Sequence, residues 1–212
     1  DLATHFYRTA RLAEGATLTE VTAEIAQAWG LGLTVLPMTD APLRTMVTLA
    51  DGTEVGFQDY FVRLRHGVPV ADVRFDHSGA TLTPAATEAL AGADRVVIAP
   101  SNPLVSIGPI RALPGVDDAL ASRRDSVVAV SPIVGGAALK GPADRMLAEL
   151  GGEPSVVGVA RLYAPIAAAL VIDPVDADLA AAVEAEGMRA IVQPSVMSSP
   201  DVAAALARAT LP

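Results

Sequence analysis

The sequence of 212 residues contains no cysteine, one lysine (Lys140) and three histidines. The absence of cysteine excludes disulfides and thiolate metal sites, and the histidines lack the spacing of metal ligands. The net charge of −9 argues against nucleic acid as a partner, because duplex binding depends on Lys and Arg facing phosphates. No apolar run reaches the length of a membrane span, and no secretory signal pattern opens the sequence. We therefore expect a cytoplasmic protein that binds neither nucleic acid nor membrane.

Several catalytic motifs are also absent. The sequence has no Gly-x-Ser-x-Gly, Walker or Gly-x-Gly-x-x-Gly pattern, and no pair of carboxylates that would hold a catalytic Mg²⁺ can be picked out. What is present is an apolar composition, with 51% hydrophobic and 18% charged residues. A chain of this length and composition can bury a large core as one domain, or as a domain with a smaller insertion.

The first 83 residues are predicted to form two unlike segments. Residues 1–30 are expected to be helical, because Thr17 and Glu20 match a capping box and Gly30 stands where a helix would stop. Residues 31–83 are expected to be an insertion of mixed α+β structure, with a hairpin turn at Asp51-Gly52. Its predicted strands are 33–36, 46–49 and 70–75, and its predicted helix is 57–64.

Residues 84–212 show a regular alternation of short apolar runs and helical stretches. The predicted strands are 96–99, 127–130, 169–172 and 190–192, and the predicted helices are 84–92, 115–122, 142–150, 177–186 and 201–209. Unbroken apolar strands separated by helices are typical of a Rossmann-like α/β core, a parallel sheet with helices on both faces. The loops that follow such strands share one edge of the sheet, where open α/β folds bind ligands.

The loop after the first of these strands carries an unusual number of polar residues and turn formers. Its sequence, APSNPLVSIGPI at 99–110, offers Ser101, Asn102 and Ser106 as neutral hydrogen-bond donors. A simple turn needs fewer such residues, so the loop either turns a corner or contacts a ligand.

The loop after the second strand should lie beside it. This segment, SPIVGGAALKGP at 131–142, contains Gly135 and Gly136, which let backbone amides approach an anion, and Lys140, which supplies a point charge. Together the two loops suit a phosphate or diphosphate. Loops after α/β strands are also rich in Ser, Gly and Pro for turn reasons alone, and the residues by themselves leave both interpretations open.

Other polar groupings have simpler explanations. His5 and Arg8 share one face of the first helix, which is a helix surface as readily as a site wall. Thr39, Asp40 and the pair Arg44-Thr45 form a polar group that fits a turn before a strand. The remaining histidines, His66 and His77, are interpreted as surface or capping residues.

Five blocks of the sequence resemble the 2-phospho-L-lactate transferase family, whose actinobacterial members are the phosphoenolpyruvate transferases of coenzyme F-420 biosynthesis. The blocks are DLATHFYRT, LPMTD followed by Arg44-Thr45, FQDYFVR, PSNPLVSIGPI and VSPIVGGAALKGPADRM. The blocks occur in this order along the chain, and the match runs from Asp1 to about Asp173. The resemblance implies transfer of a phosphoenolpyruvyl or phospholactyl group from a guanosine-diphosphate-linked donor to the ribityl hydroxyl of the deazaflavin Fo. GMP leaves, Mg²⁺ assists, and the protein is expected to be a homodimer.

With this resemblance in view, one set of residues is expected to bind substrate or nucleotide: Ser101, Asn102, Pro103, Ser106, Pro132, Gly135, Gly136, Lys140, His5, Arg8, Thr39, Asp40 and Thr45. Family members begin with a strand and a glycine-rich loop followed by aspartates that bind metal, and this sequence matches the C-terminal two-thirds of the family pattern. We therefore expect the first strand, the glycine-rich loop, the catalytic residues and the metal ligands to lie upstream, and the chain alone to catalyse weakly or not at all.

Two other interpretations compete with the transferase. A related family of gluconeogenesis and cell-shape regulators shares the α/β core and binds UDP-sugars, but Asn102-Pro103 and the FQDYFVR block favour the transferase. The chain would otherwise be a non-catalytic fragment. Within the transferase interpretation, the Arg- and Ala-rich composition favours phosphoenolpyruvate over phospholactate as the three-carbon group.

Overall fold

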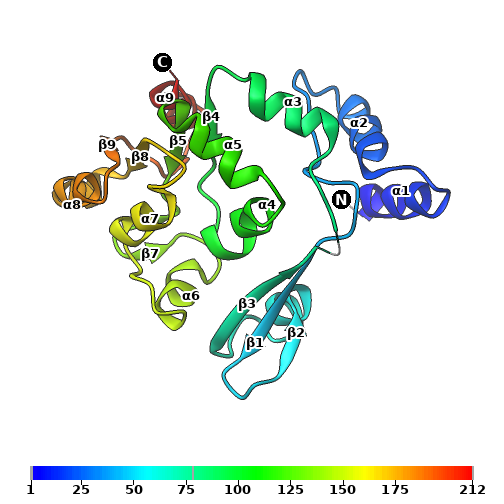
Figure 1. Cartoon of the computed structure of the whole chain (residues 1–212), viewed down its shortest axis with the longest axis horizontal. Helices are drawn as coiled ribbons and strands as arrows, with labels where there is room; N and C mark the ends of the chain where they lie inside the picture. The colour runs from blue at the N-terminus through cyan, green and yellow to red at the C-terminus, as the bar shows by residue number, and fades with distance from the viewer. Residues whose placement is uncertain (1, 78, 212) are drawn as a thin grey trace.

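The computed structural model describes residues 2–77 and 79–211, and in these ranges the chain forms separate sheets (Figure 1). A four-stranded parallel sheet has the order β4-β5-β8-β9, and a three-stranded antiparallel sheet has the order β2-β1-β3. The parallel sheet consists of β4 (Val96–Ile98), β5 (Val127–Val130), β8 (Ala169–Ile172) and β9 (Arg189–Val192). The four strands predicted for residues 84–212 are thereby confirmed.

The two central strands of the parallel sheet are buried on both faces. On one face, Ala129 and Leu170 belong to the main hydrophobic core, together with residues of the helices that cover it. On the other face, Val128 and Val171 pack with Leu206 of α9 (Pro200–Thr210). This two-sided burial explains why the strands are uninterrupted apolar runs, and it confirms the predicted α/β class with helices on both faces.

The helices after residue 83 mostly follow the prediction, with ends shifted by a few residues. They are α3 (Pro84–Gly92), α4 (Gly108–Arg111), α5 (Val116–Ser122), α6 (Ala143–Glu149), α7 (Val156–Tyr163) and α8 (Ala180–Ala185), with 3-10 turns at Arg124–Ser126 and Pro174–Leu179. The exceptions are α4 and α7, which we did not predict; α7 contains several β-branched residues, which are typical of strands. Ser155 starts this helix by accepting hydrogen bonds from the amides of Val157 and Gly158.

The three-stranded sheet comes from the predicted insertion and projects away from the parallel sheet (Figure 1). Its strands are β1 (Arg44–Leu49), β2 (Glu54–Gly56) and β3 (Val70–Asp76). The Asp51-Gly52 turn joins β1 to β2, with Gly52 at φ +84°. The strand predicted at 33–36 was wrong: the segment pairs with no strand, and Leu33 is 65% exposed. The segment has apolar residues typical of a strand, but no neighbouring strand in the described ranges is positioned to pair with it.

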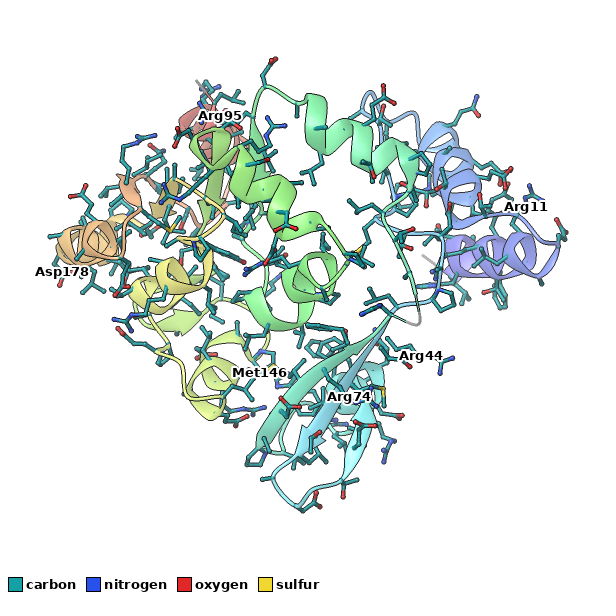
Figure 2. All side chains as sticks on the ribbon, in the orientation of Figure 1. Arg11, Arg44, Arg74, Arg95, Met146 and Asp178 are labelled. Carbon is teal, nitrogen blue, oxygen red and sulfur yellow. The ribbon has the colours of Figure 1, made fainter. Side chains whose placement is uncertain are left out.

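A second core joins this sheet to the rest of the chain. It contains Val47 of β1, Tyr60 of the π-helix η1 (Asp59–Arg63), Val105 of the π-helix η2 (Pro103–Ile107) and Met146 of α6. Met146 lies where α6 meets the three-stranded sheet (Figure 2). The insertion is therefore fixed to the core through η2 and α6.

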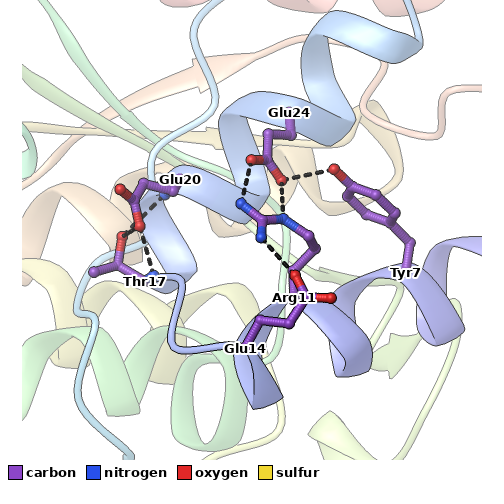
Figure 3. A network of polar contacts seen from close by, with 6 residues as sticks. All are labelled: Tyr7, Arg11, Glu14, Thr17, Glu20 and Glu24. Carbon is purple, nitrogen blue, oxygen red and sulfur yellow. Dashed lines mark hydrogen bonds and ion pairs between the residues drawn. The ribbon is translucent and has the colours of Figure 1, made fainter.

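The first two helices are α1 (Leu2–Ala13) and α2 (Leu18–Ala28), which confirms the prediction for this segment. The predicted capping box of Thr17 and Glu20 is also present. No residue of α1 is buried, and polar contacts connect it to α2 (Figure 3). Arg11 Nη2 lies 2.8 Å from Glu24 Oε1, and the Tyr7 hydroxyl donates to Glu24 Oε2 at 2.7 Å. None of the described helices combines the length and the apolar composition needed to cross a membrane.

The contact between α1 and α2 should weaken at low pH. Hydrogen bonds from Arg11 and Tyr7 lower the pKa of Glu24 from 4.5 to about 2. A carboxylate whose pKa is lower in the folded state stabilises that state above its unfolded pKa, and the stabilisation is lost as the pH falls. We expect the emission of Trp29, which lines a small cavity with Tyr7 and Glu24, to change between pH 4.5 and about 2.

Two variants test this assignment. Glu24→Gln should remove the acid transition of Trp29, because the ionised partner of Arg11 is gone. Glu14→Gln, which removes only the local Arg11–Glu14 pair, should keep it. A transition that persists in Glu24→Gln would assign the pH dependence to another carboxylate.

Gly158, in the first turn of α7, occupies a position that has no room for a side chain. A β-carbon at Gly158 would overlap the carbonyl group of Glu153, so Gly158→Ala should lower the free energy of unfolding by about 2 kcal/mol or more. Gly92→Ala is the matched control, since the space there is open and alanine should stabilise α3 by about 0.5 kcal/mol. Urea denaturation measures both. Equal stability of the two variants would contradict the predicted overlap.

Candidate functional site

A cavity of about 670 Å³ lies at the carboxyl edge of the parallel sheet. It is lined by the segments that follow three of the strands: Pro100–Asn102 after β4, Ser131-Pro132 after β5 and Ser195–Met197 after β9. Residues 139–143, which lead into α6, complete this wall, and Phe57 and Phe61 reach the cavity from the insertion. The parallel sheet thus gathers segments far apart in sequence at one edge, as predicted.

Five of the predicted site residues line this cavity: Ser101, Asn102, Ser106, Pro132 and Lys140. Pro103 is buried and lines a different cavity, of about 610 Å³, between β3, α4 and α7. The other predicted residues are not part of the 670 Å³ cavity. They are Gly135, Gly136, His5, Arg8, Thr39, Asp40 and Thr45.

Asn102 has a structural role in the first loop. Its Oδ1 accepts hydrogen bonds from the amides of Leu104 and Val105 at 2.9 and 3.3 Å, which caps η2. Its Nδ2 donates to the sulfur of Met146 at 3.8 Å. The loop therefore enters a helix immediately after Asn102, while Ser101 and Ser106 line the cavity on either side of the cap. It both turns the chain and forms a wall of the cavity.

Gly135 and Gly136 form the turn of a small hairpin, β6 (Ile133–Val134) and β7 (Ala137–Ala138). Their φ values of +60° and +78° match the type I′ turn, which requires positive φ at both central residues. The Gly135 amide donates to both carboxylate oxygens of the buried Asp176, at 3.1 and 2.9 Å. Hairpin geometry thus accounts for the two glycines, and the Gly135 amide is already engaged.

The electrostatics of the cavity favour an anion. Lys140 is the one charged side chain among the described residues that line it, and none of these residues carries a carboxylate. The side chain of Lys140 is exposed, and the serine hydroxyls and the Asn102 amide supply neutral groups around it. A point charge with three donors on a flexible stem is suited to phosphate oxygens.

The same donor set does not fit Mg²⁺, which prefers carboxylate oxygens. Within residues 2–77 and 79–211, no group of three or more His, Asp or Glu side chains could hold a metal ion. We therefore assign no Mg²⁺ ligand in this cavity.

Sequence reasoning missed the third segment at this edge, Ser195–Met197 after β9. Asp173, at the end of β8, holds it by accepting a hydrogen bond from the Ser195 amide at 2.9 Å. Burial works to raise the pKa of Asp173, but the hydrogen bonds that it accepts from the backbone of Ser195, Val175 and Val196 outweigh burial and hold this pKa below its usual value. The sequence did contain a signal for this segment, because β9 was predicted and the loop that follows a parallel strand lies at the same edge of the sheet.

The remaining predicted residues lie on other elements. His5 and Arg8 are exposed on α1, and Thr45 stands opposite Phe75 in the three-stranded sheet. Asp40 accepts hydrogen bonds from the amide and hydroxyl of Thr19 at 2.7 and 2.9 Å, in the first turn of α2. Local structure accounts for these contacts, and none of these residues reaches the cavity.

Comparison with known proteins relates this chain to transferases. The family model for 2-phospho-L-lactate transferase CofD matches residues 1–202. A phosphoenolpyruvate transferase of Streptomyces griseus is 40% identical over 216 residues, which span 100% of this chain and 68% of that protein. A 2-phospho-L-lactate transferase of Methanosarcina barkeri is 37% identical over 210 residues, which span 98% of this chain and 66% of that protein. The chain thus spans about two thirds of the length of these relatives.

Solved structures agree in fold. Protein BH3568 of Bacillus halodurans superposes with a TM-score of 0.69 at 15% identity, over 98% of this chain and 71% of that protein. A second structure of it, described as a member of the UPF0052 family, gives a TM-score of 0.66 at 16% identity. At this identity the likeness concerns the fold alone. The family match and the identity with the transferases carry the assignment, and they show that the chain belongs to the 2-phospho-L-lactate transferase (CofD) family of enzymes.

Proposed function

We propose that the protein transfers a phosphoenolpyruvyl group, or a 2-phospho-L-lactyl group, from a guanosine-diphosphate-linked donor to the ribityl hydroxyl of the deazaflavin Fo in coenzyme F-420 biosynthesis. The observation that carries the proposal is the cavity at the carboxyl edge, where Lys140 stands among neutral donors without a carboxylate. The names of the relatives support both three-carbon groups. The Streptomyces griseus phosphoenolpyruvate transferase reaches 40% identity over 100% of this chain, whereas a 2-phospho-L-lactate transferase of the same identity matches 82% of it, and this difference favours the first.

The reaction is a displacement at phosphorus. The ribityl oxygen forms a bond to the phosphorus that bears the three-carbon group, the phosphoanhydride bond to the guanosine phosphate breaks, and GMP leaves. The hydroxyl proton passes to a base that is not among the cavity residues we assign. Lys140 would neutralise charge on the diphosphate oxygens, and Ser101 and Ser106 would orient them by hydrogen bonds. Positioning and charge neutralisation supply most of the catalysis in such transfers.

Two further features of the proposal come from the family resemblance. Mg²⁺ would assist at the diphosphate, held by ligands other than the residues that line this cavity. The protein would also be a homodimer, which sedimentation velocity tests directly.

The nucleotide that this chain binds distinguishes the transferase from the regulator. Calorimetric titration of this chain should show binding of GDP in preference to UDP-N-acetylglucosamine, because the relatives that share its sequence are transferases. A preference for the UDP-sugar would instead identify a regulator of the related family. Failure to bind either nucleotide would support the non-catalytic fragment.

Lys140 is the positive charge that would contact the diphosphate of the donor. Lys140→Met keeps most of the aliphatic stem and removes the charge, so it should weaken GDP binding by about ten-fold, equivalent to about 1.4 kcal/mol. Arg208→Gln on α9 is the control for net charge, because Arg208 is exposed and does not line the cavity. Equal GDP affinity of the two variants would mean that Lys140 does not contact the diphosphate.

Asn102 both caps η2 and lines the cavity, and two substitutions separate these roles. Asn102→Asp keeps an oxygen that can cap the amides of Leu104 and Val105, but it places a negative charge at the cavity. We expect a melting temperature close to that of the unmodified protein, together with GDP affinity lower by about ten-fold or more. Asn102→Ala should lower the melting temperature instead, because the cap is lost. Unchanged GDP affinity in Asn102→Asp would assign Asn102 to structure alone.

A further inference from the structure

The cavity has an aromatic wall in addition to its polar residues. Phe57 and Phe61 line it together with Lys140. Phe61 is 39% exposed, and its ring centroid lies 5.5 Å from that of Phe57 and 5.1 Å from that of His66. Tyr60, one residue earlier, is fully buried in the core that joins the insertion to α6. Packing of the insertion against α6 therefore explains why Tyr60 is buried, but it does not explain why Phe61 faces the cavity.

The backbone around Phe61 is held in unusual conformations. Phe61 lies in the π-helix η1, a rare form that is frequent at functional sites. Arg65 and His66 follow at φ +50° and +43°, and they are the two non-glycine residues with positive φ in the part of the chain that the structure describes. Such conformations cost free energy and persist where surrounding contacts impose them. Here they place the His66 ring against Phe61.

Those contacts come from α6. Arg145 donates to the Tyr60 hydroxyl at 2.6 Å and also to the His66 carbonyl oxygen, which accepts a further bond from the Tyr60 hydroxyl at 3.5 Å. The next residue of the helix, Met146, accepts the hydrogen bond from Asn102. The segment with Lys140 leads directly into this helix. One helix therefore positions both the aromatic wall and the polar residues of the cavity.

We propose that Phe57 and Phe61, with His66 behind Phe61, form a stacking platform for a planar heteroaromatic ring of a ligand whose phosphate lies at Lys140. Aromatic side chains bind such rings by offset stacking, which tolerates different heterocycles. The assignment rests on the proposed function, in which two ligands carry such a ring: the guanine of the donor and the deazaflavin of Fo. Stacking is the chemistry common to both.

The experiment compares three probes on matched variants. Inorganic pyrophosphate and GDP are titrated by calorimetry, and Fo by its own fluorescence, against the unmodified chain, Phe61→Leu, Phe61→Trp and Val62→Ala. Phe61→Leu keeps apolar volume and removes the aromatic face. Val62 is its matched control, because it is an exposed apolar neighbour that does not line the cavity. Circular dichroism confirms that each variant is folded.

We expect Phe61→Leu to weaken binding of GDP or of Fo by about ten-fold, the usual size of one stacked ring, and to leave pyrophosphate binding unchanged. Phe61→Trp should restore the lost affinity, and Val62→Ala should behave like the unmodified chain. A loss of GDP affinity in Phe61→Leu would assign the platform to guanine, and a loss of Fo affinity would assign it to the deazaflavin.

Two outcomes would overturn the platform. If Phe61→Leu binds GDP and Fo within about two-fold of the unmodified chain, while Lys140→Met still loses GDP affinity, the platform is wrong and the proposed function stands. If the unmodified chain binds neither GDP nor Fo, the proposed function fails, and the platform fails with it.

Discussion

Parallel pairing of β4, β5, β8 and β9 is the constraint on which the rest of the structure depends. Parallel strands direct their carboxyl ends to one edge, so segments about thirty residues or more apart in sequence meet there. Two carboxylates that follow β8 then fix what lies at this edge: Asp173 holds the segment at Ser195, and Asp176 holds the hairpin turn at Gly135. The sheet therefore supplies both the position of the cavity and the groups that shape it.

The helix α6 is the second organising element. It packs against the three-stranded sheet through Met146, and it holds the backbone of the aromatic segment through Arg145. Because the segment with Lys140 runs into the same helix, the insertion and the parallel sheet contribute to one cavity with a defined mutual position. The CofD family match, over residues 1–202, includes every segment that lines this cavity.

Several of the residues predicted for the site make hydrogen bonds that stabilise local backbone structure. Asn102 caps η2, Asp40 binds the first turn of α2, and the Gly135 amide is bound by Asp176. Each of these groups lies in a sequence block that resembles a ligand-binding motif. Some or all of its hydrogen bonds are nevertheless made to other groups of the same chain. Lys140 and the serines of the first loop are left to face the cavity. A residue type and its spacing indicate which chemistry is possible, whereas the partner that a side chain finds decides which chemistry is used.

The sequence by itself determined the class of fold, most helices and strands, the capping box at Thr17 and the edge of the sheet where Lys140 would lie. Each of these follows from local signals, such as apolar periodicity, caps and turn residues, which act over a few positions of the chain. Only the tertiary structure decided that Phe61 faces the cavity while Tyr60 is buried, that α7 is a helix, and that Leu33 joins no sheet. These outcomes depend on which distant segments pack together, because burial and strand pairing are properties of contacts that the order of residues does not reveal.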